Sequence, residues 1–448
     1  MNKRIISLMA AALALLSASG QTVSFTGVGE HRVIEVTPDK GLTGLDKIFV
    51  VYDTEGVGMT FTSMTGDRAT WCSYDLSSWG DPDTLTVTWD GYATTLGQVL
   101  RNKGYIIEDN TKRYYYWVVN YADYYLELND MFINPESPCA LLSFNVDGRG
   151  TKINYVSTHG HTESLDREIK LSYNTLAWDD TTHWQEKAVV ETFESLVEGI
   201  TVEQPLCNTE FILSGDRFLE EWGIGEAIEC DYYYTPAVDC ATTAVQEDRG
   251  NDNEKGLDSG LGGSAPVHIV FTGYPTDAVV YRVWEFARDP DFEDIFLQYN
   301  QDEVDYTFND AGTYYARYMV ANADGSCLDY SDEVYTITVS ESELTCPNIF
   351  SPGSTEGVND VWKVSYKSLV DFHCWIYNRW GTLVCEFTDP GSGWDGTYHG
   401  RLVDTGVYYY VVTATGSDGV KYKKRGDITI LRYKKGASGT STGDSGGY

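Results

Sequence analysis

The stretch that decides the fold runs from Asp371 to Phe387 and reads DFHCWIYNRWGTLVCEF. Residues 371–377 and 382–387 are rich in aromatic and β-branched side chains, which are enriched in strands. The segment between them, Asn378-Arg379-Trp380-Gly381, contains the Asn and Gly that tight turns favour. The stretch therefore predicts a β-hairpin.

Two cysteines on the arms of this hairpin, Cys374 and Cys385, leave its register open. A two-residue loop would place Asn378 opposite Gly381 and bring the cysteines face to face, where they could form a disulfide. A three-residue loop with Gly381 left-handed would place the two cysteines on opposite faces of the sheet. A further interpretation treats both as small buried hydrophobic residues.

The same alternation of short strands and turns extends through the rest of the chain. Examples, each bounded by Gly, Asp, Asn or Pro, are residues 22–25, 31–36, 47–52 and 84–89. Strands that recur at a spacing of roughly 8–12 residues are typical of β-sandwiches. We therefore expect an all-β fold of tandem Ig-like sandwiches that ends in a smaller sandwich.

Breaks in this pattern and in composition divide the chain into parts. We expect a signal peptide at 1–20, followed by Ig-like sandwiches at 21–124 and at 125–245, the second of which has extra strands. A polar, Gly-rich linker should follow at 246–263. After it we expect a third sandwich at 264–340, a small sandwich at 341–434 and a flexible tail at 435–448. Two short stretches remain ambiguous. Gln98–Lys103 is compatible with a helical turn, and Glu186–Leu196 with either a helix or a strand.

The charge of the chain excludes some partners. The 448 residues carry 32 Lys and Arg against 67 Asp and Glu, a formal charge of −35. Residues 341–448 contain 11 basic and 12 acidic side chains, a net charge of −1, so the remaining 340 residues carry −34. Such a chain is not suited to neutralise phosphates or to dock on an anionic membrane, so we expect neither nucleic acid nor lipid as partner.

The N-terminus has the pattern of an export signal. Lys3 and Arg4 precede an apolar run, Ile5–Ala18, and small residues follow it. The run is shorter than the roughly 20 residues that span a bilayer, so we expect a signal peptide that is cleaved between Gly20 and Gln21. No later stretch resembles a transmembrane segment, and we expect the mature chain to be exported through the periplasm.

Nine cysteines follow the expected cleavage site, and an oxidising compartment permits disulfides. Their number is odd, their spacing is irregular and no CxxC motif occurs, so neither a zinc site nor a thioredoxin-like site is indicated. The best local candidates for one bridge are Cys207, Cys230 and Cys240.

No motif indicates catalysis or a bound cofactor, so we expect a protein that is not an enzyme. His159-Gly160-His161 could place two imidazoles on one face of a strand, but its Gly equally predicts a turn, and we expect no metal. The acidic segment 248–254 could bind calcium, although it lacks the EF-hand spacing, and we read it as part of the linker.

The aromatic run Tyr114-Tyr115-Tyr116-Trp117 has two interpretations. Alternate side chains of a strand point to opposite faces, so some of these rings should face outward. Outward rings could form a platform for a sugar, whereas inward rings would pack in the core. The sequence leaves a glycan or protein ligand open.

The third sandwich resembles the PKD-type Ig-like family. A strand, a tight turn and a second aromatic strand run from Tyr306 to Tyr318, and the resemblance continues through Asn322, Asp324 and Gly325. Residues 284–287 depart from that family, because they read Trp-Glu-Phe-Ala instead of the usual Trp-Asp-Phe-Gly-like run.

The C-terminal part carries ordered motifs of a second family. They comprise Pro347, Asn348, Asn359, Asp360, Asn378, Arg379, Trp380, Gly381, Gly393, Trp394, Asp395, Gly396, Gly406, Tyr408, Gly426, Asp427 and Arg432. This series resembles the gliding-motility-associated C-terminal domain of Bacteroidota, the type B sorting domain of the type IX secretion system. The loop 351–357 departs from the family pattern, which usually has Asn-Gly-Asp-Gly there, and so does the Gly/Ser-rich tail after residue 433.

The resemblance implies export of the chain by recognition at the outer-membrane translocon of that system. In the family the cargo is then released or fixed to the cell surface. We expect a non-catalytic cell-surface or released protein with a structural or adhesive role. The alternatives are a glycan- or protein-binding module and an accessory component of the secretion or gliding machinery.

Overall fold

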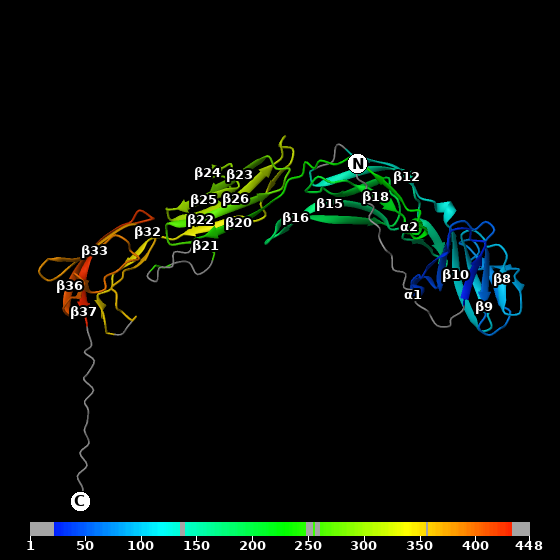
Figure 1. Ribbon diagram of the computed structural model, residues 1–448, viewed down its shortest axis with the longest axis horizontal. Coiled ribbons are helices and arrows are strands. Elements are labelled where there is room, and N and C mark those ends of the chain that lie inside the picture. The colour runs from blue at the N-terminus through cyan, green and yellow to red at the C-terminus, as the bar shows by residue number, and fades with distance from the viewer. Residues whose placement is uncertain (1–21, 135–138, 248–253, 256–259, 355–356, 432–448) are drawn as a thin grey trace, which may run out of the picture. The chain divides into compact units, whose positions relative to one another are not determined.

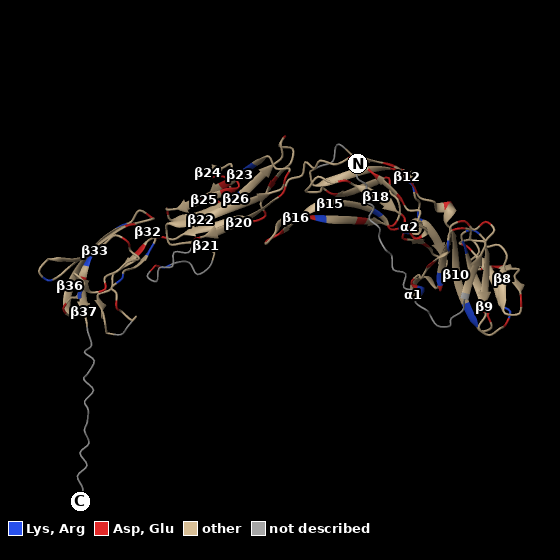
Figure 2. Cartoon of the chain, in the orientation of Figure 1, with Lys and Arg blue, Asp and Glu red and all other residues tan. Residues whose placement is uncertain are grey.

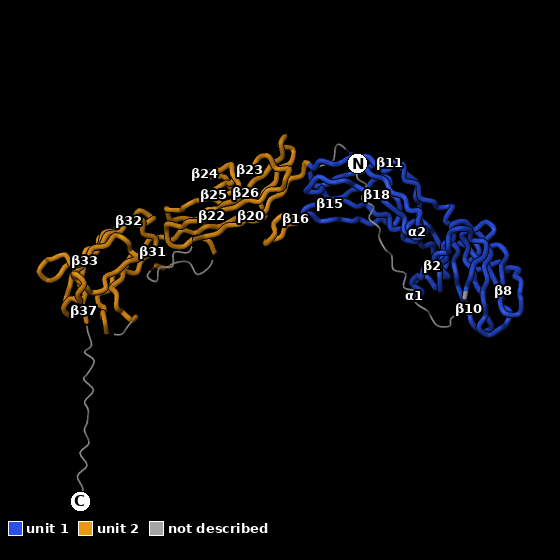
Figure 3. Tube along the Cα trace, viewed as in Figure 1, with its two compact units in different colours: residues 1–176, 186–235 blue, residues 177–185, 236–448 orange. Residues whose placement is uncertain are grey.

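The computed structural model describes residues 22–134, 139–247, 254–255, 260–354 and 357–431. The described chain consists almost entirely of strands (Figure 1). It divides into two compact units, residues 1–176 with 186–235 and residues 177–185 with 236–448 (Figure 3). The expected signal peptide with its Gly20–Gln21 cleavage point and the expected tail at 435–448 lie outside the described residues.

Two sheets form the first sandwich. One has the order β1-β4-β8-β7 and the other β2-β3-β10-β9-β5-β6, in which β3 and β10 are parallel. The elements are β1 (Thr22–Thr26), β2 (Ile34–Val36), α1 (Lys40–Thr43), β3 (Lys47–Val51), β4 (Gly58–Thr62), β5 (Thr70–Tyr74), β6 (Asp83–Leu85), β7 (Thr88–Trp89), β8 (Ala93–Leu96), β9 (Lys103–Asp109) and β10 (Lys112–Asn120). The stretch 98–103 does not form the helical turn that its sequence allowed: residues 98–100 are irregular, residues 101–102 form a turn and Lys103 begins β9.

Strand β10 is buried on both faces. Tyr114 and Tyr116 pack in the core of the first sandwich, whereas Trp117 and Val119 belong to a core that is shared with the second sandwich. Trp117 is 2% exposed. Trp117 therefore packs in the core instead of facing outward, because the second sandwich covers that face of β10, whereas Tyr115 on the same face is partly buried.

The second sandwich completes the first compact unit. Its sheets have the orders β11-β12-β17, β16-β15-β18-β19 and β13-β14. The elements are η1 (Tyr121–Tyr124), β11 (Glu127–Ile133), β12 (Leu141–Arg149), β13 (Ile153–Val156), β14 (Thr162–Leu165), β15 (Ile169–Asp179), β16 (His183–Phe193), β17 (Gly199–Glu203), β18 (Ile212–Gly215), α2 (Arg217–Trp222) and β19 (Glu226–Glu229). The ambiguous stretch 186–196 is thus mainly a strand.

The third sandwich is larger than expected. Its sheets have the orders β20-β22-β25 and β21-β28-β26-β23-β24, with β27 also paired to β26. The elements are β20 (Cys240–Gln246), β21 (Leu261–Gly263), β22 (Val267–Pro275), β23 (Tyr281–Ala287), β24 (Ile295–Tyr299), β25 (Glu303–Phe308), β26 (Gly312–Ala321), β27 (Leu328–Tyr330) and β28 (Tyr335–Val339).

Two boundaries therefore differ from the expected ones. Strand β20, assigned to the second sandwich from the sequence, pairs with β22 and so belongs to the third. Strand β21, assigned to the linker, pairs in parallel with β28. Gly262 permits this close pairing, because a Cβ there would lie 2.2 Å from the Thr338 carbonyl oxygen.

A five-stranded sheet, β30-β37-β36-β32-β33, dominates the C-terminal sandwich, with two smaller pairs, β29-β31 and β34-β35. The elements are β29 (Glu343–Thr345), β30 (Ile349–Phe350), β31 (Ser365–Lys367), β32 (Leu369–Tyr377), β33 (Leu383–Phe387), β34 (Thr397–Tyr398), β35 (Arg401–Leu402), β36 (Gly406–Gly416) and β37 (Lys421–Ile430). Within the second compact unit this sandwich contacts the third one, since the Ser368 amide donates to the Ser264 hydroxyl at 2.6 Å.

The hairpin expected at residues 371–387 forms from β32 and β33, and its loop has three residues. The Asn378 amide donates to the Thr382 carbonyl at 3.0 Å, and Gly381 has a φ of 78°. A β-bulge then shifts the register, so that Cys385 lies opposite Ile376. Because residues 374 and 376 share a face, the bulge returns Cys385 to the buried side. Both cysteines are thiols that contribute to the core.

The disulfide that the sequence suggested within the group of Cys207, Cys230 and Cys240 does not form. Cys207, Cys230 and Cys240 are all thiols in the structure. The pairing of β20 with β22 places Cys240 in the third sandwich, whereas the other two residues belong to the first compact unit.

Candidate sorting surface and binding groove

Two tryptophans link the motif residues of the C-terminal sandwich into one core. The backbones of Trp362 and Trp394 exchange hydrogen bonds of 2.8 and 2.9 Å, and both side chains are at most 2% exposed. The Trp362 Nε1 donates to the Pro347 carbonyl at 2.7 Å. The Trp394 ring packs against Tyr408, with ring centroids 5.1 Å apart. These residues of the sequence motif therefore hold the sandwich together.

Asparagine and aspartate side chains of the motif stabilise its turns. The Asn378 Oδ1 accepts from the amides of Trp380 and Thr382 at 2.9 and 3.0 Å. The Asp395 Oδ1 accepts from the Thr397 amide at 2.9 Å. Such local acceptors are the reason that Asn and Asp are favoured in turns.

A carboxylate holds together the loop that follows β30. Asp360 accepts from the amides of Gly353 and Gly357 at 2.9 and 2.7 Å, one with each oxygen. The neighbouring Asn359 takes a left-handed φ of 53°, and its carbonyl accepts from the Ser351 amide. Backbone donors thus satisfy the carboxylate in a loop that departs from the family pattern.

Glycines of the motif lie where a side chain has no room. A Cβ at Gly393 would lie 2.7 Å from the Trp362 carbonyl oxygen, and one at Gly426 would lie 2.7 Å from the Tyr410 hydroxyl. Gly396 and Gly406 have φ values of 76° and 146°. The Asn348 carbonyl accepts from the Thr429 amide and joins β30 to β37. Arg432 lies outside the described residues.

Another part of the motif faces solvent. Trp380 at the tip of the β32–β33 hairpin is 78% exposed, and the Arg379 guanidinium carbon lies 4.8 Å from its ring centroid. A tryptophan this exposed contributes little to the core of the sandwich.

The outer face of the main sheet continues this exposed region. The register places Tyr377 opposite Tyr409, and Arg425 opposite Val411. Tyr409 is 48% exposed, and Arg425 is exposed as well. We call this outer face, together with Arg379 and Trp380, the sorting surface. Its side chains are those of Asp371, His373, Trp375, Tyr377, Tyr409, Lys421, Lys423, Arg425 and Asp427.

The sorting surface combines aromatic rings with the basic side chains of Arg379, Lys421, Lys423 and Arg425, which outnumber its two carboxylates, Asp371 and Asp427. Trp375 and His373 stack with ring centroids 3.7 Å apart. The Glu386 Oε1 accepts from the Trp375 Nε1 at 3.0 Å and lies 2.7 Å from the His373 Nε2. Lys424 faces the other way and donates to the Leu344 carbonyl. The surface therefore suits a partner with apolar and acidic groups.

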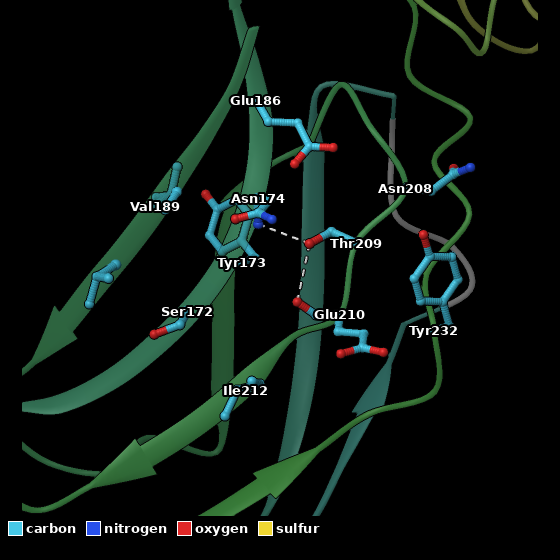
Figure 4. Close-up of a pocket in the computed structure, with 12 residues that line it drawn as sticks. Ser172, Tyr173, Asn174, Glu186, Val189, Asn208, Thr209, Glu210, Ile212 and Tyr232 are labelled. Carbon is cyan, nitrogen blue, oxygen red and sulfur yellow. Dashed lines mark hydrogen bonds between the residues drawn. The ribbon is translucent and has the colours of Figure 1, made fainter. Parts of the chain in front are cut away.

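A groove lies on the second sandwich (Figure 4). It has a volume of about 370 Å³ and is lined by parts of β15, β16 and the segments around β18 and β19. Its lining includes Ser172, Tyr173, Asn174, Glu186, Glu210 and Tyr232. Figure 4 shows Glu186 projecting from β16, while the Asn174 amide donates to the Thr209 hydroxyl at 2.8 Å.

Acidic groups set the electrostatics of this groove. Glu186 and Glu210 both line it, and its lining residues, all within the described chain, include neither Lys, Arg nor His. Tyr232 is 49% exposed and packs edge-on against Tyr234. The sequence singled out neither carboxylate, because only the fold brings residues 186, 210 and 232 together.

The histidine pair forms a turn. His159 and His161 lie between β13 and β14, and Gly160 has a φ of 78°. Both imidazoles are exposed. Within the described residues no group of three His, Cys, Asp or Glu side chains is arranged to hold a metal ion. The acidic segment 248–254 lies outside the description except for Glu254.

Together these features define a multidomain all-β protein of Ig-like sandwiches whose last sandwich carries an aromatic and basic surface. Residues 344–430 match the CHU_C type IX secretion signal domain. Residues 132–230 match a fibronectin type III domain. The resemblance to the sorting-domain family is confirmed, and so is the expected fold class. A PKD-type third sandwich stays a prediction.

Other comparisons add little. No curated protein matches the chain. The chicken CNTN1 FN1–FN3 domains share 12% identity, with 68% of this chain and 99% of that chain covered and a TM-score of 0.22. Dimeric latent PorU from Porphyromonas gingivalis shares 9% identity, with 88% of this chain and 44% of that chain covered and a TM-score of 0.16. At such TM-scores neither similarity supports an argument.

The signal domain marks the chain as exported cargo and implies interaction with the secretion machinery and sorting at the outer membrane or cell surface. Both matched domains are of non-catalytic kinds. Among the described residues no helix is long and apolar enough to cross a membrane.

Proposed function

We propose that residues 344–430 act as the outer-membrane sorting signal of this cargo, and that the preceding sandwiches are a non-catalytic passenger. The passenger acts at the cell surface or in the medium, in a structural or adhesive role. The observation that carries the proposal is the match of 344–430 to the type IX signal domain. The expected signal peptide at 1–20 supplies the inner-membrane step.

The geometry supports a division of labour among the motif residues. Trp362, Trp394 and Tyr408 are buried and build the sandwich, whereas Arg379 and Trp380 project from it. We assign the contact with the translocon to the sorting surface, where an exposed ring and exposed basic groups lie on one rigid sheet. Interface energy commonly concentrates in such Trp, Tyr and Arg side chains.

Fractionation tests the sorting proposal. The full chain is expressed in a bacterium with a working type IX system and in a derivative that lacks it. We expect the protein at the surface or in the medium of the first strain and in the periplasm of the second. Equal escape from the periplasm in both strains would contradict the proposal.

A pair of variants tests the sorting surface itself. Trp380→Ala should keep the fold and reduce surface or medium protein at least about tenfold, since it removes an exposed anchor. Tyr281→Ala is the matched control, because Tyr281 is a 55% exposed aromatic residue on the third sandwich. We expect export of the control to be unchanged. Normal export of Trp380→Ala would show that the hairpin tip is not part of the surface that the translocon recognises.

The groove favours a second candidate function, that of a binding module. An open groove with carboxylate, amide, hydroxyl and phenol groups is equipped to hold a ligand. This function is compatible with sorting, because the groove and the sorting surface lie on different sandwiches. No described feature favours an accessory role in the secretion or gliding machinery over a role as cargo.

A further inference from the structure

Buried hydrogen bonds tie the C-terminal sandwich to the third sandwich, in addition to the chain that joins them. The Ser368 amide donates to the Ser264 hydroxyl at 2.6 Å, and the Ala265 amide donates to the Ser368 hydroxyl at 3.1 Å. All three residues are at most 4% exposed. Because a buried polar group that loses its partner is costly, these bonds hold the two sandwiches in one arrangement.

The backbone of Ser368 shows that this contact is built into the fold. Ser368 lies between β31 and β32 with a left-handed φ of 51°, which residues with a Cβ rarely adopt. Its amide and hydroxyl bond to the third sandwich, and its carbonyl accepts from the Ser417 amide at 2.9 Å. Such a backbone persists where its surroundings determine it, so the third sandwich helps to shape the turn that precedes β32.

Further contacts extend the junction. The backbones of Glu254 and Tyr366 form a parallel bridge, which adds a segment to the β29–β31 pair, and the Lys255 amide donates to the Tyr366 carbonyl at 3.0 Å. The Ala311 amide donates to the Ser417 carbonyl at 3.3 Å. Several segments that precede residue 341 therefore contact the sandwich that matches the signal domain.

The charges of the two sandwiches give the junction a role in sorting. Residues 264–340 contain 14 acidic and 3 basic side chains, a net charge of −11. On β37 of the neighbouring sandwich, Lys421, Lys423 and Arg425 belong to the sorting surface, and all three are exposed. On a freely moving connection, the acidic sandwich would be present at a high effective concentration beside this basic surface and would compete with an acidic partner. A fixed junction prevents this competition.

We propose that the third and C-terminal sandwiches form one sorting unit, and that export requires the junction because it keeps the sorting surface uncovered and fixed. Ser264 and Ser368 are then positioning residues, since neither lies on the sorting surface. A surface that is already ordered loses less conformational freedom when it docks. The inference rests on the proposed sorting function and extends its signal to residues before 344.

Hydrogen exchange of the purified full chain tests whether these bonds hold the junction. Ser264→Ala removes the acceptor of the Ser368 amide, which should then exchange at least about tenfold faster. Ser331→Ala is the matched control, because Ser331 is also buried and its hydroxyl accepts from the Tyr318 amide at 3.1 Å within the third sandwich. Exchange of the Ser368 amide should be unchanged in the control.

Export is the second measurement, in a strain with a working type IX system. The double variant Ser264→Ala/Ser368→Gly removes both hydroxyls, and glycine accepts the left-handed φ at position 368. We expect it to lower surface or medium protein at least about tenfold, because two buried hydrogen bonds of the junction are lost. Ser331→Ala should be exported as the parent is.

The outcomes distinguish this inference from the sorting proposal. Normal export of the double variant, with fast exchange at the junction, would overturn the inference and leave the sorting proposal intact. Slow exchange at residues 365–370 of the double variant would show that the two hydroxyls do not hold the junction, which also overturns it. So would an equal loss of export in Ser331→Ala, because any destabilised third sandwich would then suffice. Escape of the parent without a type IX system would instead contradict the sorting proposal.

Discussion

At the scale of single residues, the first compact unit depends on a buried charge pair. Arg167 and Asp216 are fully buried with a closest N···O distance of 2.6 Å, and the Tyr121 hydroxyl donates to Asp216 at 3.0 Å. Asp216 also caps α2 by accepting from the amides of Phe218 and Leu219. Desolvation of a buried pair offsets much of its attraction, so its loss matters mainly because one charge is left unpaired.

Removal of one partner should therefore destabilise this unit strongly. We expect Arg167→Met to lower the free energy of unfolding by about 3–5 kcal/mol, because Asp216 is left charged and buried. Lys170→Met is the control: Lys170 pairs with Glu220 at the surface, and such pairs contribute at most about 1 kcal/mol. Urea unfolding followed by near-ultraviolet circular dichroism measures both, and equal effects would contradict the argument.

Two tryptophans of the sorting motif should differ in how much each contributes to the stability of the C-terminal sandwich. Trp394 is 2% exposed and Trp380 is 78% exposed. Trp394→Ala leaves a cavity and should destabilise the C-terminal sandwich by about 3–5 kcal/mol, whereas Trp380→Ala should change stability by at most about 0.5 kcal/mol. Thermal unfolding checks both values. A large loss in Trp380→Ala would mean that its effect on export is a folding effect.

At the scale of elements, cross-strand pairs give the third sandwich a pH response. The His268 imidazole on β22 lies 2.5 Å from Asp305 on β25 and 3.1 Å from Glu247, which follows β20. The hydrogen bond to Asp305, followed by attraction to both carboxylates, raises the pKa of His268 above its ordinary 6.5. The protonated imidazole thus joins three neighbouring strands.

The sign of the pH effect follows from the raised pKa. Since His268 binds its proton more tightly in the folded chain, its stabilising contribution is complete below about pH 6.5. It is lost as the pH rises through the folded pKa. Nuclear magnetic resonance of the imidazole should show titration above 6.5, and Asp305→Asn should lower the midpoint. A midpoint at or below 6.5 in the parent would refute this.

Packing of the strands also protects thiols. Burial raises the pKa of the Cys240 thiol to about 12, and it raises the pKa of Cys374 strongly as well. Because the thiolate is the reactive form, iodoacetamide at pH 8 should modify both residues at least about a hundredfold more slowly in native than in urea-unfolded protein. Mass spectrometry of the peptides measures this ratio. Rapid modification of native Cys374 would show that the inner face of β32, where Cys374 is fully buried, opens in the native protein.

Local features were predictable from the sequence, and pairings between distant strands were not. The turn at Asn378–Gly381 follows from two residue types, so its position could be predicted, but the bulge that returns Cys385 to the core depends on packing against β32. The second face of β10 reads like an exposed aromatic surface, and only the neighbouring sandwich buries Trp117. Glu186 and Glu210 form one groove for the same long-range reason.

At the scale of the whole molecule, charge and chemistry are divided along the chain. The residues before 341 carry a net charge of −34, while those from 341 onward carry −1. The red segments in Figure 2 mark the positions of Asp and Glu along the backbone of each sandwich. Strong net charge keeps a protein soluble and disfavours self-association. The near-neutral end presents the aromatic and basic sorting surface, to which we assign the proposed contact with the translocon.

This division makes a final prediction about the chain truncated after Ser340. In a strain with a working type IX system we expect the truncated protein to stay in the periplasm, because the sorting domain is gone. The truncation also exposes a junction, since Ser264 is 4% exposed beside Ser368, so retention alone could reflect misfolding. A cooperative urea unfolding transition of the truncated protein, followed by near-ultraviolet circular dichroism, would show that the remaining sandwiches are folded. Secretion of the folded, truncated chain would place the sorting signal before residue 341 and contradict the proposed function.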